Sequence, residues 1–552
     1  MSIIADELNK NKAGIVKNYM DGESFVLDPF TTLKMVCASS LFGEPQYYRK
    51  GARSDVYLNQ IDPFADYFVL SRDGRNTRTY MENIIDASLD YDFGATIAYA
   101  AELRNFYNIR INPQVIMVRA ALHPGRIAFN QSHPGVFADI QSKVMARADE
   151  PSTQLAYYLL LNKNKSKLPS VLKRSWANKL SSLNRYQVAK YKNAELGMID
   201  TVRICHANSK VIDELMQNGT IEVSESEKTW ENLRSEGKSW EDILTSGFKM
   251  PHMALLKNLR GIFSELIEAE TGYQFARRIL DGLVAGVEKG KQFPYRYYVA
   301  YNMIKNEDIS FKVMVMEALE KCLQVSLNNM PMLEGKTMIL SDNSGSAWGA
   351  LKSEYGTVKV AEIGNLSAVL TAMRCDEGYV GVFGDNLTII PISKCDSILS
   401  NLEKVNAEGR EVGYSTENGI WLFFEDAIKN KKYYDNIFIY SDMQAGRGQL
   451  YCTDEGTKDY IAFNNHNGLS GMGKNRPYVN VLELARMYRS KVFSKANLFS
   501  VQTAGYNNSA LPNYLYRGSL LYGWTGKEVV FAKTLIDEWN HLENDFTNSS
   551  EA

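Results

Sequence analysis

The second half of the chain contains the run Lys336-Thr-Met-Ile-Leu-Ser-Asp342-Asn-Ser344-Gly-Ser346. Residues 337–340 are largely apolar and predict a buried strand, which ends in a polar turn. One carboxylate, of Asp342, and the hydroxyls of Ser344 and Ser346 alternate through that turn and can converge on one point. Such oxygen ligands suit a hard divalent cation, most of all Mg2+, which keeps water or a partner's oxygen beside one or two carboxylates. A polar turn that caps the next helix is the alternative interpretation.

Two later segments favour the cation site. The strand-like run that starts at Asn436 ends in Asp442, and a Gly-bounded polar loop with Thr416 precedes the apolar residues 420–428. The carboxyl ends of strands are where open α/β sheets bind ligands. The order Asp-x-Ser-x-Ser, loop threonine and strand-terminal aspartate resembles the metal-ion-dependent adhesion site of von Willebrand factor A domains, and the resemblance extends over residues 336–532. It implies that one divalent cation, Mg2+, is bound by Asp342, Ser344, Ser346, Thr416 and Asp442.

Length and composition limit the class of protein. The chain has 552 residues, of which 45% are hydrophobic and 23% charged, as in ordinary globular proteins of two or three domains. No apolar run approaches the ~20 residues that a membrane helix needs, and residues 1–11 lack the apolar core of a signal peptide. The six cysteines are scattered without a Cys-x-x-Cys pair, which favours a reducing cytoplasm.

The chain changes its pattern near residue 330. Before it, apolar residues at three- and four-residue spacing predict helix after helix, including 86–107, 115–122, 154–161 and 273–287. We expect stacked helical hairpins in a solenoid-like array. After it, strands alternate with helices, which predicts a doubly wound α/β sheet. The predicted parts are a polar tail at 1–24, a helical module at 25–330 and an α/β domain at 331–552.

The helical part contains a basic segment. From Lys163 to Lys210 there are eleven Lys and Arg residues against two acidic ones, in a chain of net charge −2. Cations neutralise phosphates, and the interleaved Trp176, Tyr186 and Tyr191 could stack on bases. A solvated basic face balanced by acidic neighbours is the alternative. The pattern favours RNA or another polyanion.

Three further runs resemble the Ro autoantigen family. They are Ala189-Lys-Tyr-Lys192 followed by Asp200-Thr-Val-Arg-Ile-Cys-His206, Met250-Pro-His-Met-Ala-Leu-Leu-Lys-Asn-Leu259, and Asp28-Pro-Phe-Thr-Thr-Leu-Lys34. That family joins a ring of HEAT-like helical repeats, the TROVE module, to a von Willebrand factor A domain. The same order is expected here, in a protein of the bacterial or phage type, and the resemblance covers nearly the whole chain.

The resemblance implies a monomeric RNA-binding protein that is not an enzyme and binds neither membrane nor DNA. In the family, Y RNAs dock on a basic outer face, and single-stranded 3′ ends of misfolded RNAs enter the central hole of the ring. Some bacterial relatives tether an exoribonuclease. The residues expected to contact RNA here, from the family motif and the basic segment together, are Lys173, Arg174, Lys179, Arg185, Lys190, Lys192, Arg203 and His206. The chain departs from the family at Glu417, where Asp is common, and directly after His206.

Two rival functions remain at this point. In one, the protein is an adaptor whose cation coordinates a partner's Asp or Glu, and the basic face is incidental. In the other, Asp342 supports a metal-dependent phosphohydrolase. The second is weaker, because no general base is evident beside the hydroxyl-rich site.

Overall fold

The structure is a computed structural model of the whole chain. The residues that it describes are 15–17, 23–26, 28–39, 75–161, 167–191, 197–222, 224, 228–349, 359–413, 419–443, 445, 462–463, 466–467, 472–473, 476–477, 480–503, 508–512, 515–522 and 527–550. They form two compact units, one within 29–44 and 73–249 and the other within 1–28 and 250–552. The helices after residue 250 therefore belong to the same compact unit as the sheet, whereas the sequence pattern grouped residues 250–330 with the helices before them.

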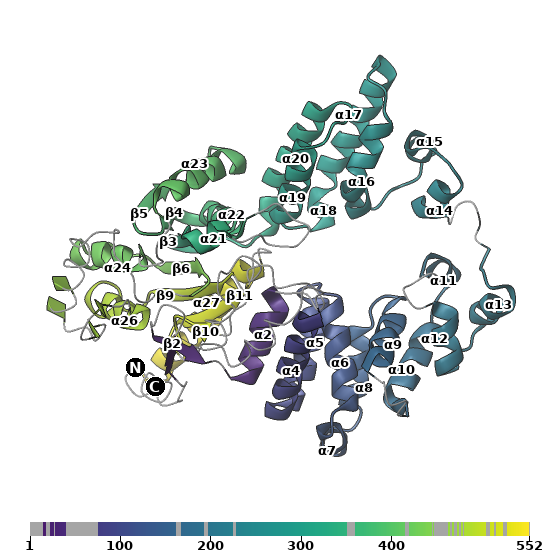
Figure 1. The fold of residues 1–552 in the computed structure, drawn as a ribbon, viewed down its shortest axis with the longest axis horizontal. Coiled ribbons are helices and arrows are strands. Elements are labelled where there is room, and N and C mark those ends of the chain that lie inside the picture. Colours follow the sequence, from purple (N-terminus) through teal and green to yellow (C-terminus); the bar gives the residue numbers. More distant parts are fainter. Residues whose placement is uncertain are drawn as a thin grey trace. The chain divides into compact units, whose positions relative to one another are not determined.

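The described part of the first unit is built of helices that pack in succession (Figure 1). They are α2 (Pro29–Ser39), α4 (Arg75–Tyr91), α5 (Phe93–Asn105), α6 (Ile111–Leu122), α7 (Gly125–Ser132), α8 (Val136–Val144), α9 (Glu150–Leu161), α10 (Ser170–Ser181), α11 (Arg185–Tyr191), α12 (Met198–Cys205), α13 (Lys210–Asn218), α14 (Trp230–Ser235) and α15 (Trp240–Thr245). In α10, Leu172, Trp176 and Leu180 recur every four residues and are fully buried.

The expected single helix over 86–107 is wrong. Helix α4 ends at Tyr91, and Asp92 has an extended backbone with φ −151° and ψ 97°. Its carboxylate accepts a hydrogen bond of 2.8 Å from the Ala95 amide, which makes Asp92 the N-cap of α5. The spacing of apolar residues continues from α4 into α5 without interruption. The end of one helix and the start of the next therefore cannot be seen in the apolar pattern.

A buried glutamine network holds four helices of the first unit together. Gln154 of α9 donates to Gln114 of α6 over 2.8 Å and accepts from Gln141 of α8 over 2.5 Å. The indole of Trp176 donates to the same Gln154 oxygen over 2.7 Å, and Gln114 donates to the Val144 carbonyl over 3.2 Å. All four side chains are buried, and their hydrogen bonds fix the relative positions of these helices.

The second unit begins with helices α16 (His252–Glu265), α17 (Glu270–Ala285), α18 (Val287–Gly290), α19 (Pro294–Lys305), α20 (Lys312–Ser326) and the 3-10 helix η4 (Leu327–Asn329). His252 lies in a tight slot between Gly286 and Gly290, and its Nε2 is 2.6 Å from the Tyr297 hydroxyl. Burial lowers the pKa of His252, so the neutral ring is favoured. A Cβ at either glycine would approach the ring to 2.7 Å.

A mixed sheet of six strands follows, in the order β11-β9-β6-β3-β4-β5. Its elements are β3 (Leu333–Asp342), α21 (Gly345–Gly349), α22 (Val360–Met373), β4 (Cys375–Phe383), β5 (Leu387–Pro391), α23 (Ile398–Glu411), α24 (Gly419–Lys429), β6 (Asn436–Ser441), α26 (Val481–Lys491), β9 (Asn497–Gln502), β11 (Gly518–Tyr522) and α27 (Lys527–Ser550). All pairs are parallel except β4 with the edge strand β5. Helices α24 and α26 share one apolar core with the strands, whereas α22 and α27 also pack on the sheet (Figure 1).

Short strands complete the second unit. β1 (Ile15–Lys17) pairs with β2 (Glu23–Val26), and β2 pairs with β10 (Asn508–Ser509), so the described part of the expected N-terminal tail joins a small sheet. β7 (Met472–Gly473) and β8 (Arg476–Pro477) form a separate pair.

The order of the strands in the six-stranded sheet changes direction at β3. The next strand in the chain, β4, lies on one side of β3, and the later strand β6 lies on the other, which is the arrangement of a doubly wound sheet. The predicted fold class is confirmed.

Within the described residues, we find no helix with both the length and the apolar character needed to cross a membrane.

The glycine slot around His252 gives a stability test. Gly286→Ala should lower the free energy of unfolding by about 1–3 kcal/mol, because its methyl group would overlap the imidazole. Gly282→Ala is the matched control, since an added Cβ there meets nothing within 4 Å, and it should be neutral or slightly stabilising. Chemical denaturation measures both, and equal stability of the two variants would contradict the slot.

Candidate cation site and nucleic-acid interface

Two buried aspartates stand at the carboxyl ends of neighbouring strands. β3 pairs in parallel with β6, with Ser341 opposite Tyr440, so that the chain leaves both strands at the same edge of the sheet. Asp342 ends β3, and Asp442 directly follows β6. Burial and the negative charge of Asp442 raise the pKa of Asp342 to about 7. The two carboxylates therefore repel each other, and a divalent cation would relieve that repulsion.

Hydrogen bonds orient the carboxylate of Asp342. The Ser344 amide donates to its Oδ1 over 2.9 Å, and the Ser441 hydroxyl donates to its Oδ2 over 3.1 Å. The hydroxyls of Ser344 and Ser346 are 3.1 Å apart, and Ser346 is exposed. The structure thus brings together Asp342, Ser344 and Ser346 and places Asp442 beside them. Thr416 lies outside the described residues.

The donor set fits a hard cation. Among the described residues, no three His, Cys, Asp or Glu side chains form a metal-binding cluster, so hydroxyls or water must complete any coordination shell here. Carboxylate and hydroxyl oxygens are suitable Mg2+ ligands. Asp342 and Asp442 would supply charge to a bound cation, and Ser344 and Ser346 would supply neutral oxygens.

Buried asparagines support the turn between Asp342 and Ser344. Asn343 donates to Asn365 of α22 over 2.9 Å, and Asn365 donates back to Asn343 and on to Asn406 of α23, each over 2.9 Å. A Cβ at Gly409 would lie 2.2 Å from the Asn343 side chain, so only glycine leaves room for the network. These supporting residues were not predictable from the sequence, because Asn365 and Asn406 are remote from the motif and have no signature of their own.

A hairpin turn holds both ends of the loop that contains Thr416. The Asn386 amide donates to the Val412 carbonyl over 2.8 Å, and the Gly419 amide donates to the Gly384 carbonyl over 3.2 Å. A Cβ at Gly413, where φ is 88°, would approach Asp385 to 2.3 Å. The described residues on each side of the loop are therefore fixed to the turn between β4 and β5.

The residues expected to bind RNA differ in their exposure to solvent and in the protein groups that they already contact. Arg174, Arg203 and His206 are exposed, and His206 ends α12 in a left-handed conformation with φ 60°. Arg203 has Asp200 at 3.8 Å, a distance at which an exposed pair contributes little. Lys173 of α10 is half-buried. Helix α10 packs against α12, and the charge of Lys173 partly offsets the rise that burial causes in the pKa of the Cys205 thiol.

The remaining cations make defined contacts. Arg185 donates to both carboxylate oxygens of Glu214, over 2.7 and 2.6 Å, which ties α11 to α13. Lys179 donates to the Ala146 carbonyl over 3.1 Å, and burial lowers its pKa. Lys190 Nζ lies 5.7 and 5.6 Å from the ring centres of Tyr186 and Tyr191. Lys192 lies outside the described residues.

One aromatic expectation is wrong. Trp176 is fully buried and its indole donates to Gln154, so it belongs to the core and cannot stack on a base. Tyr186, by contrast, is exposed beside Lys190.

Comparisons with known proteins agree with this architecture. The model of the TROVE domain family matches residues 222–332. Over these residues the chain is similar to the TROVE domain family. The matched residues include the run 250–259, which the sequence analysis compared with the Ro family, and the predicted resemblance to that family is confirmed.

The fold is also that of a solved Ro structure. The crystal structure of the Deinococcus radiodurans Ro (RSR) protein matches with a TM-score of 0.55 and 14% sequence identity, over 82% of this chain and 94% of that one. A comparison with curated protein sequences finds no match.

The cation site gives a test by metal addition. Mg2+ should raise the unfolding temperature of the wild-type protein, because a ligand that binds only the folded state stabilises it. Asp342→Asn should abolish this response, and the metal-free variant should be at least as stable as the metal-free wild type, since one of two repelling charges is removed. Thermal unfolding with and without Mg2+ measures both effects.

Asp396→Asn is the control, since Asp396 pairs with Lys404 on the surface of the same unit. It should retain the full metal response. A response of Asp342→Asn equal to that of the wild type would contradict the assignment.

Proposed function

We propose that the chain is an RNA-binding protein of the Ro type. The observation that carries the proposal is a set of cations on three successive helices, α10, α11 and α12, in a chain whose net charge is −2. Arg174 and Arg203 are exposed, and Lys190 Nζ lies within 5.7 Å of the ring centres of Tyr186 and Tyr191. Phosphates bind such cations, and unpaired bases stack on exposed tyrosines.

The resemblance to the Ro family extends the proposal to the kind of RNA. Small structured non-coding RNA of the Y type would bind the basic face, and single-stranded 3′ ends of misfolded RNA would enter the hole of a helical ring. The protein would act in RNA quality control or decay in the cytoplasm, as a monomer and without catalysis. An exoribonuclease tethered through RNA is a further partner that fits this role.

The cation site suggests a second function for the α/β domain. Ser346 is an exposed residue and marks the side on which a bound Mg2+ would accept an external oxygen. A carboxylate of a protein partner is such a ligand, because the coordination shell of Mg2+ usually includes groups from outside the protein. The domain would then act as an adaptor while the helices bind RNA.

A salt series tests the RNA-binding face. Lys190→Ala with Lys192→Ala should reduce the slope of log affinity against log salt by roughly 1.5 and weaken the binding of structured RNA, because two phosphate contacts are lost. Fluorescence anisotropy with a labelled hairpin RNA at several salt concentrations measures the slope. Unchanged affinity and slope in the double variant would contradict the proposal.

Two matched controls accompany the salt series. Lys429→Ala with Lys432→Ala removes two lysines that pair with Glu425 and Asp426 on the α/β domain, and should leave RNA binding unchanged. Asp342→Ala should keep RNA affinity within a few-fold, because the cation site and the basic face lie in different compact units. Loss of RNA binding in folded Asp342→Ala protein would show that the two sites are coupled.

A further inference from the structure

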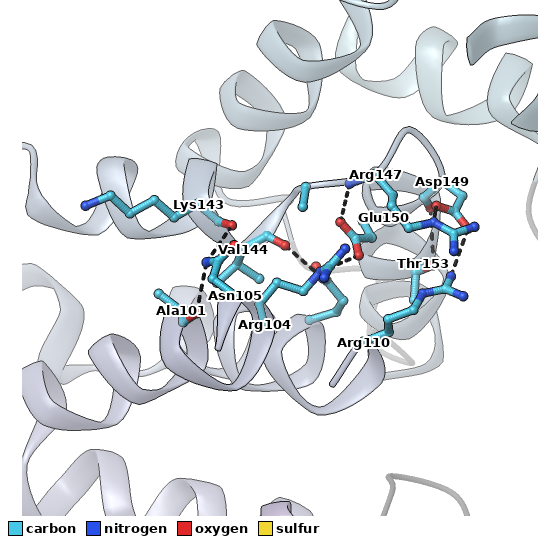
Figure 2. Close-up of polar contacts among 12 residues, drawn as sticks. Ala101, Arg104, Asn105, Arg110, Lys143, Val144, Arg147, Asp149, Glu150 and Thr153 are labelled. Atoms are coloured by element: carbon cyan, nitrogen blue, oxygen red, sulfur yellow. Dashed lines mark hydrogen bonds and ion pairs between the residues drawn. The ribbon is translucent and has the colours of Figure 1, made fainter. Parts of the chain in front are cut away.

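The loop between α8 and α9, residues 145–149, has a fixed backbone. Lys179 of α10 donates to the Ala146 carbonyl over 3.1 Å, and the Arg147 amide donates to Glu150 over 2.6 Å. Glu150 also accepts from Arg104 of α5 over 2.7 Å, in a pair whose side chains are both buried. Figure 2 shows these contacts from α5 and α9 converging on the loop. The backbone of Arg147 is therefore held before any ligand arrives.

Two arginine side chains meet on one carboxylate in this loop. Arg147 donates through Nε and Nη2 to the two oxygens of Asp149, each over 3.0 Å. Arg110, directly before α6, donates through Nη2 to the same Asp149 Oδ2 over 3.0 Å. Because both Nη2 atoms lie 3.0 Å from one oxygen, the two guanidinium groups are neighbours (Figure 2).

The two arginines keep unused hydrogen-bonding capacity. A guanidinium has five N–H donors, and Asp149 occupies two of those on Arg147 and one on Arg110. None of the described residues accepts from Nη1 of Arg147 or from Nε and Nη1 of Arg110. The side chains are 34% and 44% exposed, whereas that of Asp149 is only 15% exposed. The carboxylate thus lies beneath the pair, and free donors remain at the surface.

Tyr191 connects this pair with the basic face. The Arg147 guanidinium lies 4.9 Å from the Tyr191 ring centre, and Lys190 Nζ lies 5.6 Å from the same centre. Arg147 is therefore next to α11, although it precedes the basic segment of the sequence by sixteen residues. Arginine stacked on an aromatic ring is restricted in orientation, so it loses less entropy when it binds a phosphate.

The local charge is positive. The cations around the loop outnumber its carboxylates by five to two; they are Arg104, Arg110, Arg147, Lys179 and Lys190, against Asp149 and Glu150. Arg104 and Glu150 neutralise each other in the interior. The excess positive charge belongs to Arg110, which is exposed, and to three half-buried cations, Arg147, Lys179 and Lys190.

We propose that Arg110 and Arg147, oriented by Asp149, form an arginine pair that binds a phosphate of the RNA backbone. The proposal rests on the RNA-binding function proposed above and extends the basic face from α11 to α6 and the α8–α9 loop. Planar guanidinium groups bind phosphate through two parallel hydrogen bonds, and two of them side by side suit one phosphate or two successive ones. Tyr191 completes the site by holding Arg147 against α11.

The contacts of the loop separate this role from a structural one. Hydrogen bonds of Lys179, Glu150 and Arg104 already hold the backbone. The pair of Arg110 with Asp149, in which the arginine is 44% exposed, adds little stability by itself. A merely structural pair would alter the unfolding temperature without altering the salt dependence of RNA binding. A phosphate-binding pair alters the salt dependence.

The test uses the full-length protein and a labelled hairpin RNA over a range of salt. Arg110→Ala with Arg147→Ala should weaken binding and reduce the slope of log affinity against log salt by about 1.4–1.8, the value for two lost contacts. Arg260→Ala is the matched control, because Arg260 is an exposed arginine that pairs with Glu307 over 3.1 Å in the other compact unit. It should leave both affinity and slope unchanged.

Arg147→Lys is a second variant that keeps the positive charge and removes the planar fork. It should weaken binding several-fold with little change of slope, since a lysine contacts phosphate as a point charge. Circular dichroism establishes that each variant is folded. Wild-type affinity and slope in folded Arg110→Ala/Arg147→Ala protein would overturn the arginine pair, and so would wild-type affinity of Arg147→Lys if the double variant does not fold.

The experiment also separates this proposal from the function on which it rests. If the wild-type protein shows no salt-dependent RNA binding, both are overturned. If Lys190→Ala/Lys192→Ala weakens binding and the arginine double variant does not, only the arginine pair is overturned.

Discussion

The parallel pairing of β3 with β6 is the constraint on which the α/β domain depends. It places two strands that are far apart in sequence side by side, so that Asp342 and Asp442 leave the sheet at the same edge. Both are buried, and burial together with the negative charge of Asp442 raises the pKa of Asp342. A sheet that needed only stability would place apolar side chains there, since burying like charges is unfavourable. The unfavourable arrangement is explained if a cation binds between them.

The surroundings of these aspartates are correspondingly rigid. The side-chain amide of Asn365 in α22 hydrogen-bonds both to Asn343, directly after β3, and to Asn406 in α23. On the other side, the turn at 384–386 fixes Val412 and Gly419. Aspartates held in this way would need little reorganisation to bind an ion, since groups behind a metal site usually serve to orient its ligands.

Local patterns were predictable from the sequence, and distant contacts were not. The strand before Asp342 and the strand Asn436–Ser441 were found because a short apolar run between polar turns has few other interpretations. The break at Asp92 was missed because a cap changes backbone direction without interrupting apolar spacing. Trp176 was assigned to the surface by its basic neighbours, whereas its four-residue spacing with Leu172 and Leu180 assigns it to the core.

The grouping of helices α16 to α20 with the sheet was equally beyond sequence reasoning. The change from helical to alternating pattern near residue 330 is real, but it marks a change of secondary structure and not a gap in packing. Arg374 Nε donates to the Met330 carbonyl over 3.0 Å, and the Ile398 amide donates to Gln324 over 3.4 Å. Compact units are defined by such contacts, which a linear pattern does not contain.

Charge in the helical unit shows why counting residues cannot locate a binding surface. Arg104, Arg185 and Arg203 carry the same charge and differ in every property that matters for RNA. Arg104 is buried with Glu150, where removal of either partner would leave an uncompensated charge, so its role is to hold the fold. Arg185 donates through both Nη1 and Nη2 to Glu214. Arg203 is exposed, and the carboxylate of Asp200 is 3.8 Å away from it. A phosphate can compete for an arginine only where that arginine retains exposed donors, and this condition is met by Arg203 within the basic segment and by Arg147 outside it.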